Sequence, residues 1–200
     1  MDEPLLLQDR DDRGVVTLTL NRPGAFNALS EAMLTALGEV LDAIAADDTV
    51  RVVVLGASGR AFCAGHDLKE MRAEPSLQYY QRLFAQCTAV MLAIQRLPVP
   101  VIARVHGLAT AAGCQLVATC DLAVADEDAT FGLSEINWGI IPAGIVTKSV
   151  AMALMQRTAL YYIMTGEPFD GRRAAEIGLV NVAVPKDQLE ARVRQLANTL

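Results

Sequence analysis

Histidine and cysteine, which supply many of the ligands in protein metal sites, are scarce in this sequence. The 200 residues include two histidines, His66 and His106, and four cysteines without C-x-x-C spacing: Cys63, Cys87, Cys114 and Cys120. Two histidines are too few for a histidine-based metal site. Three of the cysteines lie in apolar or small-residue segments, which is typical of buried, reduced thiols. We therefore expect no bound metal and reduced cysteines.

Clustered positive charge and long hydrophobic runs are also missing. The net charge is −6, and the Lys and Arg residues are scattered along the chain, which argues against a nucleic-acid-binding surface. No uninterrupted apolar run approaches the length of a membrane span, and residues 1–13 lack the basic start and apolar core of a secretory signal. We expect a soluble, cytoplasmic protein with no nucleic-acid or membrane partner.

The sequence does contain enough apolar residues for one core. Hydrophobic residues make up 52% of the chain, which suits a single domain over residues 1–200. Alternation and apolar runs predict strands at 14–20, 50–55, 101–105, 122–125 and 180–184. Ser30, Asp67, Ser76 and Asp170 predict helix starts, and further helices are expected at 112–119, 144–154, 158–165 and 187–200. This order of short elements indicates an α/β fold.

Two turns of small residues each run into a predicted helix. The first turn leads to His66 through Ala64 and Gly65, and the second surrounds Ala112. Small residues let a substrate approach the backbone, and N–H groups at the start of a helix stabilise negative charge. Glu135 follows in F-G-L-S-E-I-N-W-G-I, where apolar neighbours favour a raised pKa. Together these features indicate a site that stabilises a thioester enolate, although either turn alone also suits close helix packing.

The two turns, their order and the F-G-L-S-E-I-N-W-G-I block resemble the enoyl-CoA hydratase/isomerase, or crotonase, superfamily over about residues 15–184. With L-Y-Y-I-M-T-G and A-A-E-I-G-L-V-N, the block is most similar to the hydroxycinnamoyl-CoA hydratase-lyases. The resemblance implies a crotonase-like spiral of ββα units, with the usual C-terminal helices after about residue 186 shortened or missing. It also implies an acyl-CoA substrate, no cofactor beyond the CoA of that substrate, and a homotrimer or hexamer.

The resemblance also implies the roles of individual residues. The backbone N–H groups of His66 and Ala112 would form an oxyanion hole, and Glu135 would be the acid/base. The residues implied to bind CoA are Ala25, Phe26, Ala64, Asp67, Leu68 and Lys69. Lys69 is a candidate phosphate partner because Gly24 stands where many relatives have lysine; the alternative is a solvated helix lysine. Asn137 and Trp138 are candidates for the acyl pocket, and Trp138 equally suits the core.

Gln115 departs from the family pattern, because typical hydratases have a second glutamate at this position. A glutamine can hold a water molecule but cannot take its proton at neutral pH. Hydration by two carboxylates is therefore in doubt, and we favour hydration coupled to carbon–carbon cleavage, with Glu135 and Gln115 as catalytic residues. Simple hydration, double-bond isomerisation by one glutamate, and a catalytically weak acyl-CoA-binding relative remain as alternatives.

Overall fold

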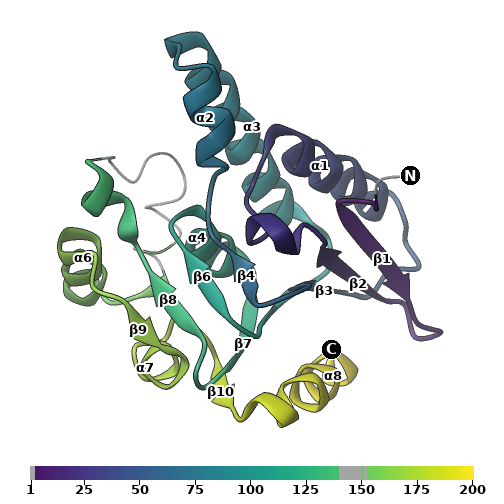
Figure 1. Ribbon diagram of the computed structural model, residues 1–200. Helices are drawn as coiled ribbons and strands as arrows, with labels where there is room; N and C mark the ends of the chain where they lie inside the picture. The colour runs from purple at the N-terminus through teal and green to yellow at the C-terminus, as the bar shows by residue number, and fades with distance from the viewer. Residues whose placement is uncertain (1–2, 140–149, 151–152) are drawn as a thin grey trace.

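The computed structural model of the chain describes residues 3–139, 150 and 153–200 (Figure 1). The larger of its two sheets has the spatial order β1 (Leu6–Arg10), β2 (Val15–Leu20), β3 (Val52–Ala57), β5 (Val101–Val105), β7 (Leu122–Asp126) and β10 (Val182–Val184). Neighbouring strands in this sheet are parallel except β1 and β2. Within the described residues, no helix is long and apolar enough to cross a membrane.

A smaller sheet lies beside the first and is built from very short strands. It has the order β4 (Ala61–Cys63), β6 (Leu108–Thr110), β8 (Thr130–Gly132) and β9 (Phe169–Asp170). The pairs β3 and β4, β5 and β6, and β7 and β8 each place their first strand in the larger sheet and their second in the smaller one. The α/β class and the succession of ββα units expected from the sequence are thus present.

Most of the described helices begin where the sequence predicts, although the helix predicted from 158 begins at Gln156. The described helices are α1 (Glu31–Ala45), α2 (Leu68–Ala73), α3 (Leu77–Arg96), α4 (Ala112–Thr119), α6 (Gln156–Thr165), α7 (Gly171–Glu176) and α8 (Leu189–Thr199), with 3-10 turns η1 (Pro23–Ala25), η2 (Ser134–Trp138) and η3 (Lys186–Gln188). Ser30, Asp67, Ser76 and Asp170 each accept a hydrogen bond from a backbone N–H in the first turn of α1, α2, α3 and α7. Such caps supply partners that the helix itself lacks.

The larger sheet is covered on both faces. On one face, Leu18 and Leu55 belong to the same buried cluster as the apolar sides of α1 and α3. On the other face, Val54 and Ile102 pack with Val193 of α8, which lies across the sheet from α1 and α3 (Figure 1). Because both faces are covered, every residue of β3 is buried, as its continuous apolar run predicts.

The structure corrects the ends of several predicted elements. β3 is Val52–Ala57 rather than 50–55, β10 starts two residues later than predicted, and η3 precedes α8 where a continuous helix from 187 was predicted. β1 and the short strands β4, β6 and β9 were not predicted. The helix predicted at 144–154 falls mostly outside the described residues.

Candidate active site

The first small-residue turn follows β4 and is held on both sides by backbone hydrogen bonds. The Ala64 N–H donates to the Phe26 carbonyl over 3.1 Å, and the Leu29 N–H donates to the Gly65 carbonyl over 2.8 Å. Gly65 has a φ of +91°, a conformation that glycine adopts without the steric cost of a side chain. The backbone that leads to His66 is therefore fixed by Phe26 and Leu29, which follow η1 in the chain.

The second turn is strained and tightly packed. Ala111, the residue before α4, has φ 49° and ψ −128°, a rarely populated conformation whose cost is about 1–3 kcal/mol. A Cβ at Gly113 would lie 2.0 Å from the Cys63 carbonyl oxygen, so the start of α4 rests directly on β4. The N–H of Ala112 is at the first position of α4, where a helix offers its N–H groups no internal partner.

The two turns are in contact with each other. A Cβ at Gly65 would lie 3.0 Å from the Ala111 Cβ and 3.3 Å from the Ala112 nitrogen. His66 directly follows Gly65. The structure therefore brings together the backbone of His66 and that of Ala112, the two positions that the sequence indicates. The positive end of the α4 dipole is at the same place.

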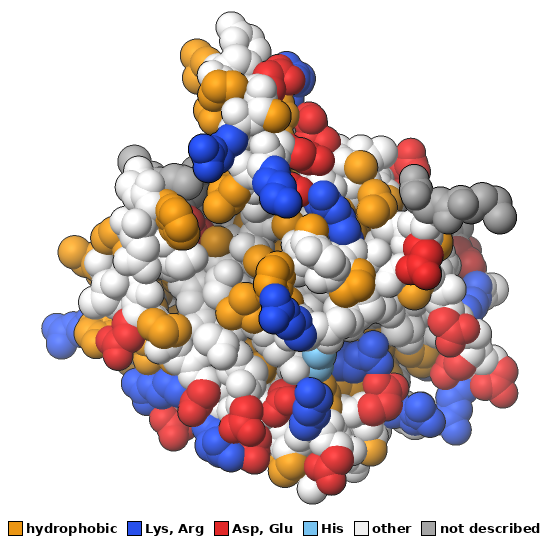
Figure 2. Space-filling model, viewed as in Figure 1, with side chains coloured by type: hydrophobic (Ala, Val, Ile, Leu, Met, Phe, Trp, Pro, Cys, Tyr) orange, Lys and Arg blue, Asp and Glu red, His pale blue; other side chains and the backbone are white. Residues whose placement is uncertain are grey.

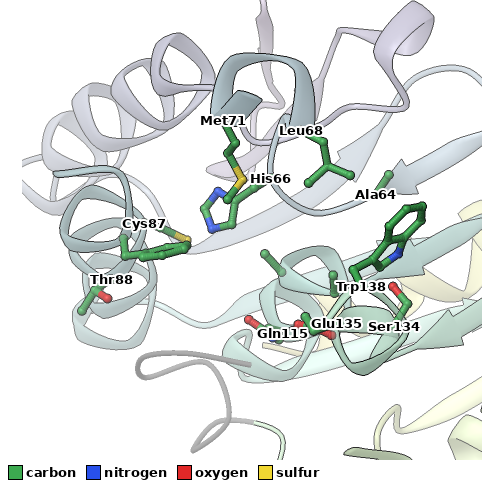
Figure 3. Close-up of a pocket in the computed structure, with 13 residues that line it drawn as sticks. Ala64, His66, Leu68, Met71, Cys87, Thr88, Gln115, Ser134, Glu135 and Trp138 are labelled. Carbon is green, nitrogen blue, oxygen red and sulfur yellow. Dashed lines mark hydrogen bonds between the residues drawn. The ribbon is translucent and has the colours of Figure 1, made fainter. Parts of the chain in front are cut away.

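A cavity opens at this junction (Figure 3). Its wall includes seven predicted site residues: Ala64, His66, Leu68, Ala112, Gln115, Glu135 and Trp138. Six further residues line it: Met71, Phe84, Cys87, Thr88, Ala111 and Ser134. Leu68 and Trp138 are 46% and 68% exposed, and hydrophobic side chains flank the hollow below α2 on the molecular surface (Figure 2). The cavity therefore has an apolar rim.

Glu135 and Gln115 form a hydrogen-bonded pair in the cavity wall. Gln115 is on α4 and donates from Nε2 to Glu135 Oε1 over 2.7 Å, while Glu135 is held on η2. Both residues are buried, and Gln115 Oε1 and Glu135 Oε2 have no hydrogen-bond partner. Burial raises the pKa of the Glu135 carboxyl above its ordinary value. A carboxyl group with a raised pKa is suited to gain and lose a proton closer to neutral pH.

The His66 side chain lies in the cavity wall opposite this pair. Its ring meets Phe84 edge to face, with 5.4 Å between the ring centroids, and Figure 3 shows it near Met71 and Cys87. Burial lowers the pKa of the imidazole, and the Leu29 backbone partly counters this effect. The ring is therefore neutral at pH 7, with one nitrogen as a donor and the other as an acceptor.

Five of the predicted site residues do not line the cavity. Ala25 and Phe26 belong to the η1 segment, where the Arg60 guanidinium lies 4.3 Å from the centre of the Phe26 ring. Lys69 is exposed on α2. Whether Ala25, Phe26 and Lys69 contact CoA outside the cavity stays a prediction.

Asp67 and Asn137 have structural contacts that explain their positions. Asp67 accepts from the backbone N–H groups of Lys69 and Glu70 and pairs with Arg22 over 2.6 Å. Burial opposes ionisation of Asp67, but these partners outweigh it and lower the pKa of the carboxyl. The Asn137 amide lies over the end of α6, where a Cβ at Gly166 would be 3.1 Å from its Nδ2. Asn137 does not line the cavity, and its contact with an acyl chain stays a prediction.

The sequence did not identify the α3 side of the cavity or Met71 of α2. Phe84, Cys87 and Thr88 share one face of α3 because they are three and four residues apart. The signal in the sequence is that periodicity, which a helix packed into the core shows equally. Met71 from α2 completes this side.

The cysteines are not candidate nucleophiles. Cys63, Cys87 and Cys114 are buried and free, and burial raises the pKa of each thiol to about 12. At neutral pH they therefore stay protonated, and the thiolate is the reactive form. Across residues 3–139, 150 and 153–200, no group of three or more His, Cys, Asp or Glu side chains is arranged to hold a metal ion.

Known proteins resemble this chain over nearly its full length. A family model described as enoyl-CoA hydratase/isomerase matches residues 10–200. The chain is 38% identical over 200 residues to mouse (Mus musculus) enoyl-CoA hydratase domain-containing protein 3, mitochondrial, with 99% of this chain and 66% of that protein covered. It is 39% identical over 192 residues to a hydroxycinnamoyl-CoA hydratase-lyase of Pseudomonas fluorescens, with coverages of 94% and 69%.

The fold is also shared with solved structures. The crystal structure of an enoyl-CoA hydratase from Mycobacterium smegmatis matches with a TM-score of 0.96 and 60% identity, covering 98% of this chain and 76% of that one. The chain spans 66% of the length of the mouse relative. Because the family model, the relatives and the fold agree over almost every residue of the chain, the protein belongs to the enoyl-CoA hydratase/isomerase family.

Proposed function

We propose that this protein is an enzyme that acts on acyl-CoA thioesters, with Glu135 as its proton carrier. The observation that carries the proposal is the buried Glu135 carboxyl, which has a raised pKa and one unpartnered oxygen in the cavity where the two turns meet. A carboxyl group in this state can take a proton from a substrate or water and return it.

The backbone amides of His66 and Ala112 are proposed to hold the thioester oxygen as negative charge develops on it. The contact between Gly65 and the start of α4 supports this role. So does the strained Ala111 conformation, since strain of this kind is often found at functional sites. Each such donor contributes about 3–4 kcal/mol to the stabilisation of a transition state in comparable sites.

Gln115 is proposed to position Glu135 and a water molecule. Gln115 Nε2 donates a hydrogen bond to Glu135 Oε1. The other carboxyl oxygen, Glu135 Oε2, has no partner and is the atom that would accept the proton. Gln115 Oε1 is a second free acceptor, so one water could donate a hydrogen bond to each of these oxygens and turn a lone pair to the substrate. Glu135 would then take the proton as the water oxygen adds to the double bond.

Hydration coupled to cleavage is the reaction that we favour. Glu135 would first return the proton of the water to carbon 2, which completes the hydration and frees the carboxylate. It would then take the proton of the new 3-hydroxyl as the bond between carbons 2 and 3 breaks to release an aldehyde, and would give that proton to carbon 2 of the acetyl-CoA enolate. The 39% identity to a hydroxycinnamoyl-CoA hydratase-lyase supports this choice. Isomerisation is the second candidate, because one carboxylate beside a glutamine suffices to move one proton between two carbons.

CoA is proposed to lie outside the cavity along η1 and α2. Lys69 is exposed there, and Arg60 lies over the Phe26 ring. Figure 2 shows several Lys and Arg side chains on the surface beside the hydrophobic opening, which suits the phosphates of CoA. A homotrimer or hexamer remains part of the proposal on the family resemblance.

The proposal predicts that Glu135→Gln lowers kcat by at least about a hundredfold, because general acid–base catalysis contributes about 10²–10⁴-fold. The purified protein is given crotonyl-CoA, a 3-enoyl-CoA and feruloyl-CoA, and the products are identified by mass. Water addition, chain cleavage and isomerisation give different products, so the same assay chooses among the reactions.

Glu39→Gln is the matched control, since Glu39 is an exposed glutamate on α1 and should leave kcat unchanged. Equal turnover by Glu135→Gln would show that Glu135 does not carry the proton. Binding of acyl-CoA by the wild-type protein without turnover would instead favour the catalytically weak relative.

A further inference from the structure

The His66 imidazole is a polar group on an otherwise apolar side of the cavity. Its neighbours there include Met71, Phe84 and Cys87, and its ring rests edge to face on Phe84. None of the steps proposed above uses this side chain, because only the backbone N–H of His66 is assigned to the thioester oxygen. The sequence likewise gives the imidazole no role in proton transfer.

The imidazole is not fully satisfied by the protein. Nδ1 is buried without a partner at good hydrogen-bond geometry, and the interaction of the ring with the Leu29 backbone offsets only part of the lowering of its pKa. A buried polar atom without a partner costs folding free energy, and native proteins satisfy most such atoms. An unsatisfied imidazole in a cavity wall therefore suits a partner that comes with the ligand.

The position of the ring indicates which part of a ligand it would meet. The His66 backbone is proposed to bind the thioester oxygen, and the side chain extends from there towards α3, where Cys87 and Thr88 lie (Figure 3). The Gln115–Glu135 pair, which would act on the carbons next to the thioester, is on another part of the wall. With the thioester oxygen bound as proposed, the imidazole would face the part of the acyl chain beyond the reacting carbons.

We propose that the His66 imidazole hydrogen-bonds a hydroxyl group on the acyl chain, so that the protein prefers acyl-CoA thioesters hydroxylated beyond carbon 3. A hydroxyl both donates and accepts, so it matches a neutral imidazole in either tautomer. The Thr88 hydroxyl lines the same side and offers the ligand a second polar contact. This inference rests on the proposed binding of acyl-CoA and adds the chemical class of the acyl group.

Binding of saturated ligands tests the inference without any turnover. The dissociation constants of hexanoyl-CoA and of hexanoyl-CoA with a hydroxyl at carbon 4, 5 or 6 are measured by calorimetry. We expect at least one hydroxylated ligand to bind the wild-type protein about tenfold or more tightly than hexanoyl-CoA, because the unhydroxylated chain leaves the imidazole unpaired. In His66→Phe, which keeps an aromatic ring against Phe84, the ratio should fall to about one.

Two further variants separate a polar contact from a general change of the cavity. Met71→Leu alters the same wall without removing a hydrogen-bonding group and should keep the wild-type ratio. Thr88→Val removes the other hydroxyl of this side and should keep most of the preference.

Equal binding of all four ligands by the wild-type protein would overturn the inference, and so would a preference that persists in His66→Phe or disappears only in Thr88→Val. The wild-type comparison is decisive even if His66→Phe does not fold. Turnover of crotonyl-CoA, measured alongside, tests the proposed function separately, because it requires no hydroxyl on the acyl chain.

Discussion

Buried polar atoms without partners are concentrated in the cavity. Of the four such side-chain atoms within the described residues, Gln115 Oε1, Glu135 Oε2 and His66 Nδ1 belong to residues that line it, and Tyr79 Oη does not. Native proteins satisfy the great majority of buried polar groups. The three atoms in the cavity wall therefore point to a ligand site, in which the first two suit a water molecule and the third suits a polar acyl chain.

The buried carboxyl of Glu135 should make the protein less stable at neutral pH than a variant without it. Burial raises its pKa above the ordinary value of 4.5, so between these two pKa values the folded state binds more protons than the unfolded state. The free energy of unfolding then falls as pH rises through this window. Glu135→Gln removes this titration and can still accept the hydrogen bond from Gln115.

We therefore expect Glu135→Gln to have a higher Tm than the wild-type protein at pH 7, and the difference to shrink as pH falls to 4.5 and below. Thermal melts across this pH range measure it, with Glu39→Gln as the control that should show no pH-dependent difference. A Tm difference that is independent of pH, or a wild-type protein that is more stable at pH 7, would contradict the raised pKa.

At the scale of the elements, α4 depends on its close contact with β4. The contact requires Gly113, where a Cβ would lie 2.0 Å from the Cys63 carbonyl oxygen. Gly113→Ala should push the start of α4 away and lower the free energy of unfolding by about 3 kcal/mol or more, because neither backbone can yield easily. Urea denaturation measures the change.

Gly38→Ala in α1 is the matched control for this prediction. A Cβ at Gly38 would lie 3.9 Å from Val90 Cγ2, which is an ordinary contact. Alanine is favoured over glycine inside a helix by about 0.5–1 kcal/mol, so this variant should be slightly more stable than the wild-type protein. If Gly113→Ala unfolded at the wild-type urea concentration, the start of α4 would not be held against β4 as described.

The sequence predicted the elements whose signals are local and missed those whose partners are distant. Ser30 and Asp67 cap their helices through residues two or three positions away, so the pattern is visible in the chain. The missed strands β4, β6 and β9 have two or three residues each, too few to show a period. Asn27 was missed as well, although it is fully buried and its Nδ2 donates to the carbonyls of Ser58 and Ala61.

The same distinction applies to the cavity. Small residues and Glu135 lie in continuous motifs, so the sequence indicates them together. The α3 side depends on how α3 is placed over the two turns, and the periodicity of Phe84, Cys87 and Thr88 does not specify that placement. The partner of Glu135 Oε1 was likewise visible only in the folded chain.

At the scale of the whole molecule, the larger sheet joins two apolar clusters. The cluster with α1 and α3 includes Val53 and Leu55 of β3, and the cluster with α8 includes Val52 and Val54 of the same strand. Arg104 of β5 also pairs with Glu190 of α8. Alternate residues of β3 belong to the two clusters. If the packing on one face of the sheet is lost, the strand that supports the cluster on the other face therefore loses its cover as well.

We therefore expect residues 1–200 to unfold as one cooperative unit. Leu83→Ala in α3 and Val193→Ala in α8 remove buried side chains from different clusters, and they should lower the free energy of unfolding by about 2–5 and 1–3 kcal/mol. Each should shift the urea midpoint without changing the slope m, with coincident transitions in circular dichroism and fluorescence.

If α8 instead formed a separate unit, Val193→Ala would give an early partial transition or a smaller m, whereas Leu83→Ala would not. Since β3 leads directly into β4 and the first turn of the cavity, a single transition would also mean that disruption at α8 is transmitted to the candidate site.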